Sequence, residues 1–91
     1  MDISPAQCRA ARGLLDITQD QLAALSGISK RAIGNFEAGE TRLMHANMQL
    51  LRATLERVGV EVIDGERPGV RLNDVTLAKM HHALRHKESA S

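Results

Sequence analysis

The chain has 91 residues, a formal net charge of +1 and one aromatic residue, Phe36. That length can bury one modest core without a metal or disulfide. Its single cysteine, Cys8, excludes an internal disulfide and fits a reducing cytoplasm; we expect it to pack as a small hydrophobe rather than act as a nucleophile. No apolar run approaches the ~20 residues that span a bilayer, and residues 1–5 lack the pattern of a signal peptide. The scarcity of aromatics disfavours all-β domains and base-stacking binders of RNA or single strands, while the net charge neither favours nor excludes nucleic acid.

Capping residues and helical periodicity predict four helices before residue 59. Ser4 and Pro5 are typical of an N-cap and a first helical position, so the first helix is expected over residues 5–15. The fourth is expected over residues 46–58, with Gly59 ending it. Both carry apolar stripes at helical spacing: Cys8, Ala11 and Leu15 in the first, and Met48, Leu51, Leu55 and Val58 in the fourth.

Two shorter helices lie between these, joined by a tight turn. Thr18 and the glutamine three residues later are typical of a capping box, which predicts a helix over residues 19–26. Gly27 ends that helix, and Ser29 is a good N-cap for the next, expected over residues 30–38.

The pattern changes after residue 59. Residues 60–63 and 70–72 predict two strands of a hairpin, and Asn73 or Asp74 is expected to cap a last helix over residues 75–86. We therefore expect a mainly α fold with two parts: a helical domain of residues 1–58, and an appendage of residues 59–91 made of the hairpin and the last helix.

Residues 19–38 carry the signature of a helix-turn-helix. Two short helices meet across a turn of three to four residues that contains glycine. Gly27 suits a left-handed conformation that costs a residue with Cβ ~1–2 kcal/mol, and Ala23 is small where the two helices cross. Leu22, Ile28 and Ile33 are expected to fill the wedge between them. An ordinary helical hairpin in an all-α bundle is the alternative, but the order and spacing of these residues favour the helix-turn-helix.

Residues 12–43 resemble the helix-turn-helix domain of the lambda and 434 repressor and Cro family, also called the XRE family. The matching residues are Arg12, Leu15, Thr18, Gln19, Leu22, Ala23, Gly27, Ser29, Ile33, Glu37 and Gly39. With the flanking helices the resemblance covers about residues 4–58, and residues 59–72 are similar to a short strand extension found in many small bacterial members. The resemblance implies a four-helix domain that binds double-stranded DNA. The last helix is not part of the common pattern.

In this family the third helix lies in the major groove, which implies base-reading roles for Ser29, Lys30, Arg31 and Asn35. Arginine and lysine can donate to guanine O6 and N7, and asparagine can pair with adenine through two hydrogen bonds. Gly34 departs from the usual larger polar residue. A close approach of the backbone to DNA or the absence of any contact would explain it, and we favour the close approach.

The resemblance also implies contacts that do not read sequence. Thr18 and Gln19 at a helix N-terminus, and Arg42 beyond the third helix, are expected to bind phosphates. Arg12 and Glu37 are expected to form an ion pair between the first and third helices, although both could simply be solvated. Arg9 is left open between a phosphate contact and a solvated charge.

The hairpin and last helix are expected to form a dimer contact. An isolated two-stranded hairpin is marginal in water, so it needs cover from the last helix or from a second copy of the chain. A two-fold dimer would read a palindromic operator. The residues expected at this contact are Val60, Val62, Val70, Leu72, Leu77, Met80 and Leu84.

The histidines near the C-terminus are expected to form a solvated basic face rather than a metal site. His82 and His86 have the i, i+4 spacing of two ligands, but Glu88 is the one acidic residue nearby. The sequence has no glycine-rich phosphate loop, no His–Glu zinc motif and no credible catalytic triad. We therefore expect neither a cofactor nor enzymatic activity.

Three functions remain open. The first is a cytoplasmic, nucleoid-associated transcriptional regulator, in particular a repressor. The second is a DNA-binding antitoxin whose C-terminal part binds a toxin protein. The third is a protein-interaction module that no longer reads DNA, which Lys30, Arg31 and Asn35 argue against because a decayed reader need not keep side chains that suit base edges.

Overall fold

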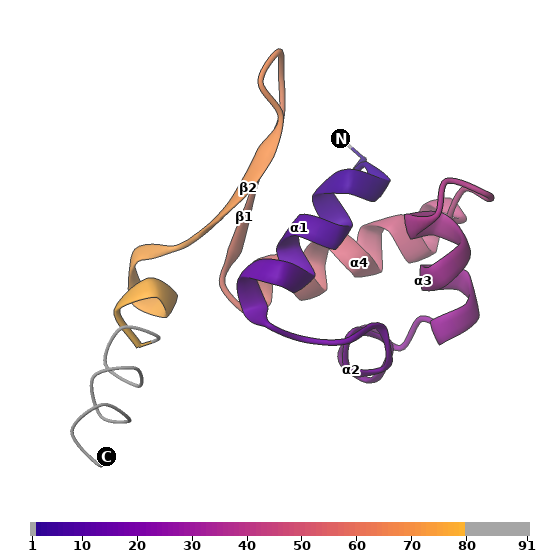
Figure 1. The fold of residues 1–91 in the computed structure, drawn as a ribbon, viewed down its shortest axis with the longest axis horizontal. Helices are drawn as coiled ribbons and strands as arrows, with labels where there is room; N and C mark the ends of the chain where they lie inside the picture. Colours follow the sequence, from indigo (N-terminus) through magenta and orange to yellow (C-terminus); the bar gives the residue numbers. More distant parts are fainter. Residues whose placement is uncertain (1, 80–91) are drawn as a thin grey trace.

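The structure is a computed structural model that describes residues 2–79. It contains four helices followed by an antiparallel hairpin (Figure 1), so the mainly α prediction is confirmed. The elements are α1 (Pro5–Leu15), α2 (Gln19–Ser26), α3 (Lys30–Glu37), α4 (His45–Arg57), β1 (Val60–Ile63) and β2 (Gly69–Leu72). Residues 74–79 are also helical. The predicted bounds differ by at most one residue at each end, and the rest of the expected last helix lies outside the described residues.

Side-chain caps set where the first three helices begin. Thr18 and Gln21 form the predicted capping box, and the hydroxyl of Ser29 accepts a hydrogen bond from the amide of Ala32 at 3.1 Å. Ser4 forms a second capping box with Gln7. Helix α4 starts after Met44 without a side-chain cap. The sequence therefore carries no capping signal there, and the predicted start at residue 46 is one residue late. Of the two residues expected to cap the last helix, Asn73 does so, accepting from the Thr76 amide at 2.8 Å.

One hydrophobic core joins the four helices to the hairpin. The expected wedge residues Leu22, Ile28 and Ile33 are at most 3 % exposed. Val60 is 1 % exposed and belongs to the same core, so this core continues past residue 58, where the helical domain was expected to end. The buried apolar set is Ile3, Cys8, Ala11, Leu22, Ile28, Ile33, Phe36, Met48, Leu51, Leu55 and Val60.

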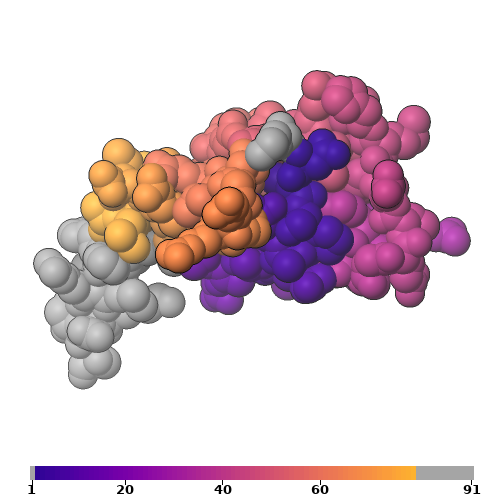
Figure 2. All heavy atoms as spheres, turned by 90° about the horizontal axis from the view of Figure 1, so that it is seen from above, coloured from indigo at the N-terminus to yellow at the C-terminus, as the bar shows by residue number. Residues whose placement is uncertain are grey.

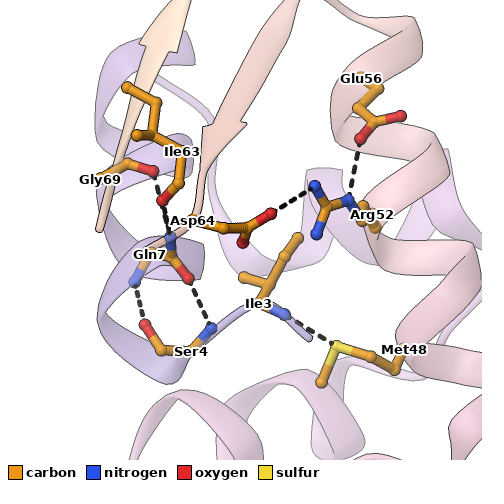
Figure 3. Close-up of polar contacts among 9 residues, drawn as sticks. All are labelled: Ile3, Ser4, Gln7, Met48, Arg52, Glu56, Ile63, Asp64 and Gly69. Atoms are coloured by element: carbon orange, nitrogen blue, oxygen red, sulfur yellow. Dashed lines mark hydrogen bonds and ion pairs between the residues drawn. The ribbon is translucent and has the colours of Figure 1, made fainter. Parts of the chain in front are cut away.

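Polar contacts also fix the hairpin against the helices (Figure 3). The amide nitrogen of Gln7, a residue only 6 % exposed, donates to the carbonyls of Ile63 at 3.0 Å and Gly69 at 3.1 Å, one on each strand. From α4, Arg52 donates to Asp64 at 3.1 Å and to Glu56 at 3.0 Å. The hairpin is therefore held from both α1 and α4.

We expect Gln7→Ala to destabilise the protein by about 1–3 kcal/mol, because two strand carbonyls lose their buried donor. Gln21→Ala is a matched control, since Gln21 is exposed, caps α2 in the same way and is remote from the hairpin. Urea denaturation followed by circular dichroism measures both changes. Equal losses in the two variants would show that the contacts with the hairpin contribute nothing to stability.

Residues 74–79 lie at the end of the molecule away from α3, and the hairpin stands beside α1, between this segment and α3 (Figures 1 and 2). Residues 59–79, called the C-terminal arm below, therefore leave α3 uncovered. Within the described part of the chain, no helix has the length and apolar character needed to cross a bilayer.

Candidate nucleic-acid interface

Helix α3 is anchored by one face and open on the other. Ile33 and Phe36 are 0 % and 5 % exposed, and both belong to the core. Gly27 has a φ of 78°, so α2 ends in the left-handed conformation that the turn requires. The face of α3 opposite the core carries exposed Lys30 and Arg31 at its N-terminal end.

The four predicted base readers differ in how they are placed. Arg31 is exposed and forms no ion pair with any residue in 2–79. Lys30 is also exposed, but its ammonium lies 3.3 Å from a carboxylate oxygen of Asp20 on α2. Ser29 uses its hydroxyl oxygen to cap α3, and Asn35 is half-buried one turn further along. Arg31 is thus the most available reader of the four.

The carboxylate of Glu37 joins α1, α2 and α3 although its side chain is only 3 % exposed. Arg12 donates to both of its oxygens, at 2.7 and 2.6 Å, so the structure brings these two residues together. The Cys8 thiol donates at 3.2 Å and the Gln19 amide at 3.0 Å. Arg9 donates to the backbone carbonyl of Glu37, which makes it a structural contact in this structure. Glu37, Arg12, Cys8 and Gln19 are called the Glu37 cluster below.

The cluster shifts the pKa values of its members. Burial raises the pKa of Glu37, but the hydrogen bonds from Arg12, Gln19 and Cys8 outweigh burial and bring it below its usual value. Burial, followed by the bond to Glu37, raises the pKa of the Cys8 thiol to about 12. Cys8 therefore stays protonated at neutral pH and donates to the carboxylate. Cys8 lies in the core as expected, but no feature of the sequence indicates its bond to Glu37.

Two of the three expected phosphate-binding residues, Thr18 and Gln19, lie around a shallow depression where α2 begins. Thr18 uses its hydroxyl oxygen to cap α2, accepting from the Gln21 amide at 3.1 Å. The side-chain amide of Gln19 is turned toward Glu37. Arg42 is exposed in the loop after α3. The depression is lined by Arg12, Asp16, Ile17, Thr18, Gln19, Asp20 and Lys30.

The side chain of Gln19 lies close to Gly34. A Cβ atom built at this position would lie 3.4 Å from the Gln19 side-chain oxygen. The end of Gln19 therefore lies against the bare backbone of α3. A Cβ at position 34 would make ordinary van der Waals contact with it, and a longer side chain extending toward α2 would compete for that space.

The expected dimer residues are only partly available. Val60 is buried in the core of its own chain, so its side chain is not available for the expected contact with a second copy. Val62, Val70 and Leu72 are partly buried, whereas Leu77 is 40 % exposed. Met80 and Leu84 lie outside the described residues, as do His82 and His86. Among residues 2–79 there is no group of three or more side chains suited to hold a metal ion.

Comparison with models of protein families matches residues 9–61 to the helix-turn-helix family of the Cro/C1 (XRE) type. The matched segment is more than half of the chain and contains α2, α3 and α4 complete. Comparison with curated proteins finds no match. Members of the matched family are DNA-binding regulators and are generally not enzymes. The chain belongs to the Cro/C1-type family of DNA-binding helix-turn-helix proteins.

Proposed function

We propose that this protein is a sequence-specific transcriptional repressor that binds its operator by placing α3 in the major groove of double-stranded DNA. The observation that carries the proposal is the open N-terminal end of α3, where Lys30 and Arg31 are exposed. The opposite face of the helix is fixed by the core, and the Glu37 cluster ties the C-terminal end of the helix to α1 and α2. A helix held in place by its packing, with exposed cations at its N-terminal end, has what base recognition needs.

The proposed roles follow the placement of each side chain. Arg31 reads guanine through O6 and N7, because its guanidinium is exposed and can donate two parallel hydrogen bonds. Lys30 leaves Asp20 when it meets DNA, at small cost, since both side chains are more than half exposed. Arg42 and the free backbone N–H groups at the start of α2 bind phosphates and set the register.

We expect Arg31→Ala and Arg42→Ala to weaken DNA binding in different ways. Arg31→Ala should cost about 1–3 kcal/mol with the preferred sequence and relax preference at one base pair. Arg42→Ala should weaken all sequences alike and reduce the salt slope by about 1. Binding to the promoter fragment upstream of the protein's own gene, across a salt series, separates the two effects. A uniform loss in both variants would contradict base reading by Arg31.

We further propose that the protein binds as a two-fold dimer through the arm formed by residues 59–79. Val75 and Leu77 are 65 % and 40 % exposed beside the partly buried hairpin residues, so apolar surface remains uncovered here. A two-stranded sheet also leaves its outer edges open to a second copy. The arm is remote from α3, so pairing through it leaves α3 free for a half-site.

Sedimentation equilibrium of the full chain at tens of micromolar tests the dimer. We expect twice the chain mass, and we expect Leu77→Asp to shift the protein toward monomer because the substitution places a charge in an apolar contact. Leu25→Asp is the control, because Leu25 is 43 % exposed on α2 and lies outside the arm, and it should leave the mass unchanged. A monomeric wild-type protein would contradict the proposed dimer.

The same exposed arm supports a second candidate, an antitoxin that binds DNA with α3 and a toxin protein with residues beyond 59. A short reading frame beside the gene, whose product forms a complex with this chain, would favour the antitoxin. Loss of that complex in Leu77→Asp with unchanged DNA binding would place the toxin on the arm.

A further inference from the structure

Helix α3 has no side chain at position 34, and a residue of α2, Gln19, lies beside that position. Position 34 follows Lys30 by one helical turn, and glycine there provides no side chain. The side-chain oxygen of Gln19 lies 3.4 Å from the point where a Cβ of residue 34 would stand. Both residues are only half-buried, so the contact between Gln19 and α3 is not enclosed in the core.

Glu37 fixes which end of that amide faces α3. A carboxylate can only accept hydrogen bonds, so the nitrogen of Gln19 must face Glu37, and it does so at 3.0 Å. Arg12 and Cys8 hold the carboxylate in turn, and the lowered pKa of Glu37 keeps it ionised at neutral pH. The oxygen of Gln19 is therefore directed to Gly34 and cannot exchange places with the nitrogen.

The amide retains the groups that recognise a base. Glu37 uses one of its two N–H donors, and no other hydrogen bond of the Gln19 side chain is formed among residues 2–79. One N–H donor and the carbonyl acceptor are left. That pair matches the N7 acceptor and the N6 amino donor of adenine, which glutamine and asparagine read with two hydrogen bonds.

We propose that Gln19 supplies the base-reading group that α3 lacks at position 34, with Gly34 providing the space and Glu37 setting the orientation of the amide. The chemistry left on the amide identifies the target as an adenine in the major groove. The inference rests on the proposed function, because it requires α3 to lie in that groove. It assigns the side chain of Gln19 a role in sequence choice, so the phosphate contact expected at this position falls to the backbone N–H groups at the start of α2.

The test is a set of base-preference profiles, measured by equilibrium selection from a library of randomised double-stranded DNA with the full chain. The variants are wild type, Gln19→Ala, Gly34→Leu and the double variant. Arg42→Ala is the control, because a phosphate contact carries no sequence information. Ratios of affinity between sequences do not depend on the active fraction of a preparation, so partial unfolding of a variant does not obscure the result.

Gln19→Ala should reduce discrimination at one base pair of each half-site by between about 5-fold and 150-fold and leave the other positions unchanged. Gly34→Leu should reduce discrimination at the same base pair, because its side chain displaces the amide. The double variant should lose no more there than either single variant. A Gln19→Ala profile scaled equally at all positions, or unchanged, would overturn the inference. A wild-type protein without any base preference would instead contradict the proposed function.

Discussion

Replacing Arg12 with leucine should destabilise the protein by about 3 kcal/mol at neutral pH. The change leaves the Glu37 carboxylate, 3 % exposed, without its charged partner, and removing one member of a buried pair typically costs about 3–5 kcal/mol. The lower end applies because Arg12 itself is 21 % exposed and because Gln19 and Cys8 still donate. For a domain of this size, that loss is a large fraction of the total stability, which is on the order of 5–15 kcal/mol.

The pH dependence of stability should change sign at the same time. In the wild type the pKa of Glu37 is lower when folded than when unfolded, so its contribution is present above about pH 4.3 and is lost as the pH falls through the folded pKa. Without Arg12 we expect burial to raise the pKa of Glu37 in the folded state. Acidification would then increase the stability of the variant, because it neutralises the buried carboxylate. Urea denaturation at neutral pH and near pH 4.5 measures this. A constant difference between the two proteins at both pH values would contradict the role assigned to Glu37.

Gly59→Ala should destabilise the protein by about 2–5 kcal/mol and displace the helical segment 74–79. Gly59 has a φ of +105°, which residues with a Cβ rarely adopt, and its new Cβ would stand 1.9 Å from the hydroxyl of Thr76. The segment is held at this point by a 2.7 Å hydrogen bond from the Asn73 amide to the Gly59 carbonyl. Strain and overlap therefore act together on the connection between α4 and the C-terminal arm.

Gly65→Ala is the matched control for this second prediction. Gly65 has nearly the same φ, +104°, but a Cβ there would have nothing within 4 Å. It should therefore show the backbone cost alone, about 1–2 kcal/mol. Urea denaturation gives both losses, and circular dichroism shows any loss of helix in Gly59→Ala. If both variants lose the same stability and keep the same helicity, Thr76 is not packed against Gly59.

Local signals were sufficient to predict most of the fold. Thr18, Ser29 and Gly27 act on backbone groups within a few residues of themselves, so their effects can be inferred from spacing alone. The predicted start of α4 is one residue too late, because no side chain caps this helix. The role of Gln7 was missed for the opposite reason: its partners, Ile63 and Gly69, are more than fifty residues away and are main-chain carbonyls that carry no sequence signal.

The candidate interface was predictable where a family pattern fixes a position, and not where contacts depend on packing. Position and residue type together indicated that Arg12 and Glu37 would meet. That Gln19 and Cys8 share the same carboxylate depends on how α1 and α2 pack on α3. The burial of Val60 could not be predicted for the same reason. A strand residue that follows a glycine has the same sequence pattern whether it faces the core of its own chain or a second chain.

The central claim, that α3 reads double-stranded DNA, is tested most directly by the affinity of the full chain for two duplexes of equal length near 0.15 M salt. One carries the sequence enriched from a randomised library, and the other carries the same bases in scrambled order. We predict that the enriched duplex binds more tightly than the scrambled one by about a thousandfold or more. Equal affinities with equal salt slopes would contradict it, because they would show attraction to phosphates without base recognition.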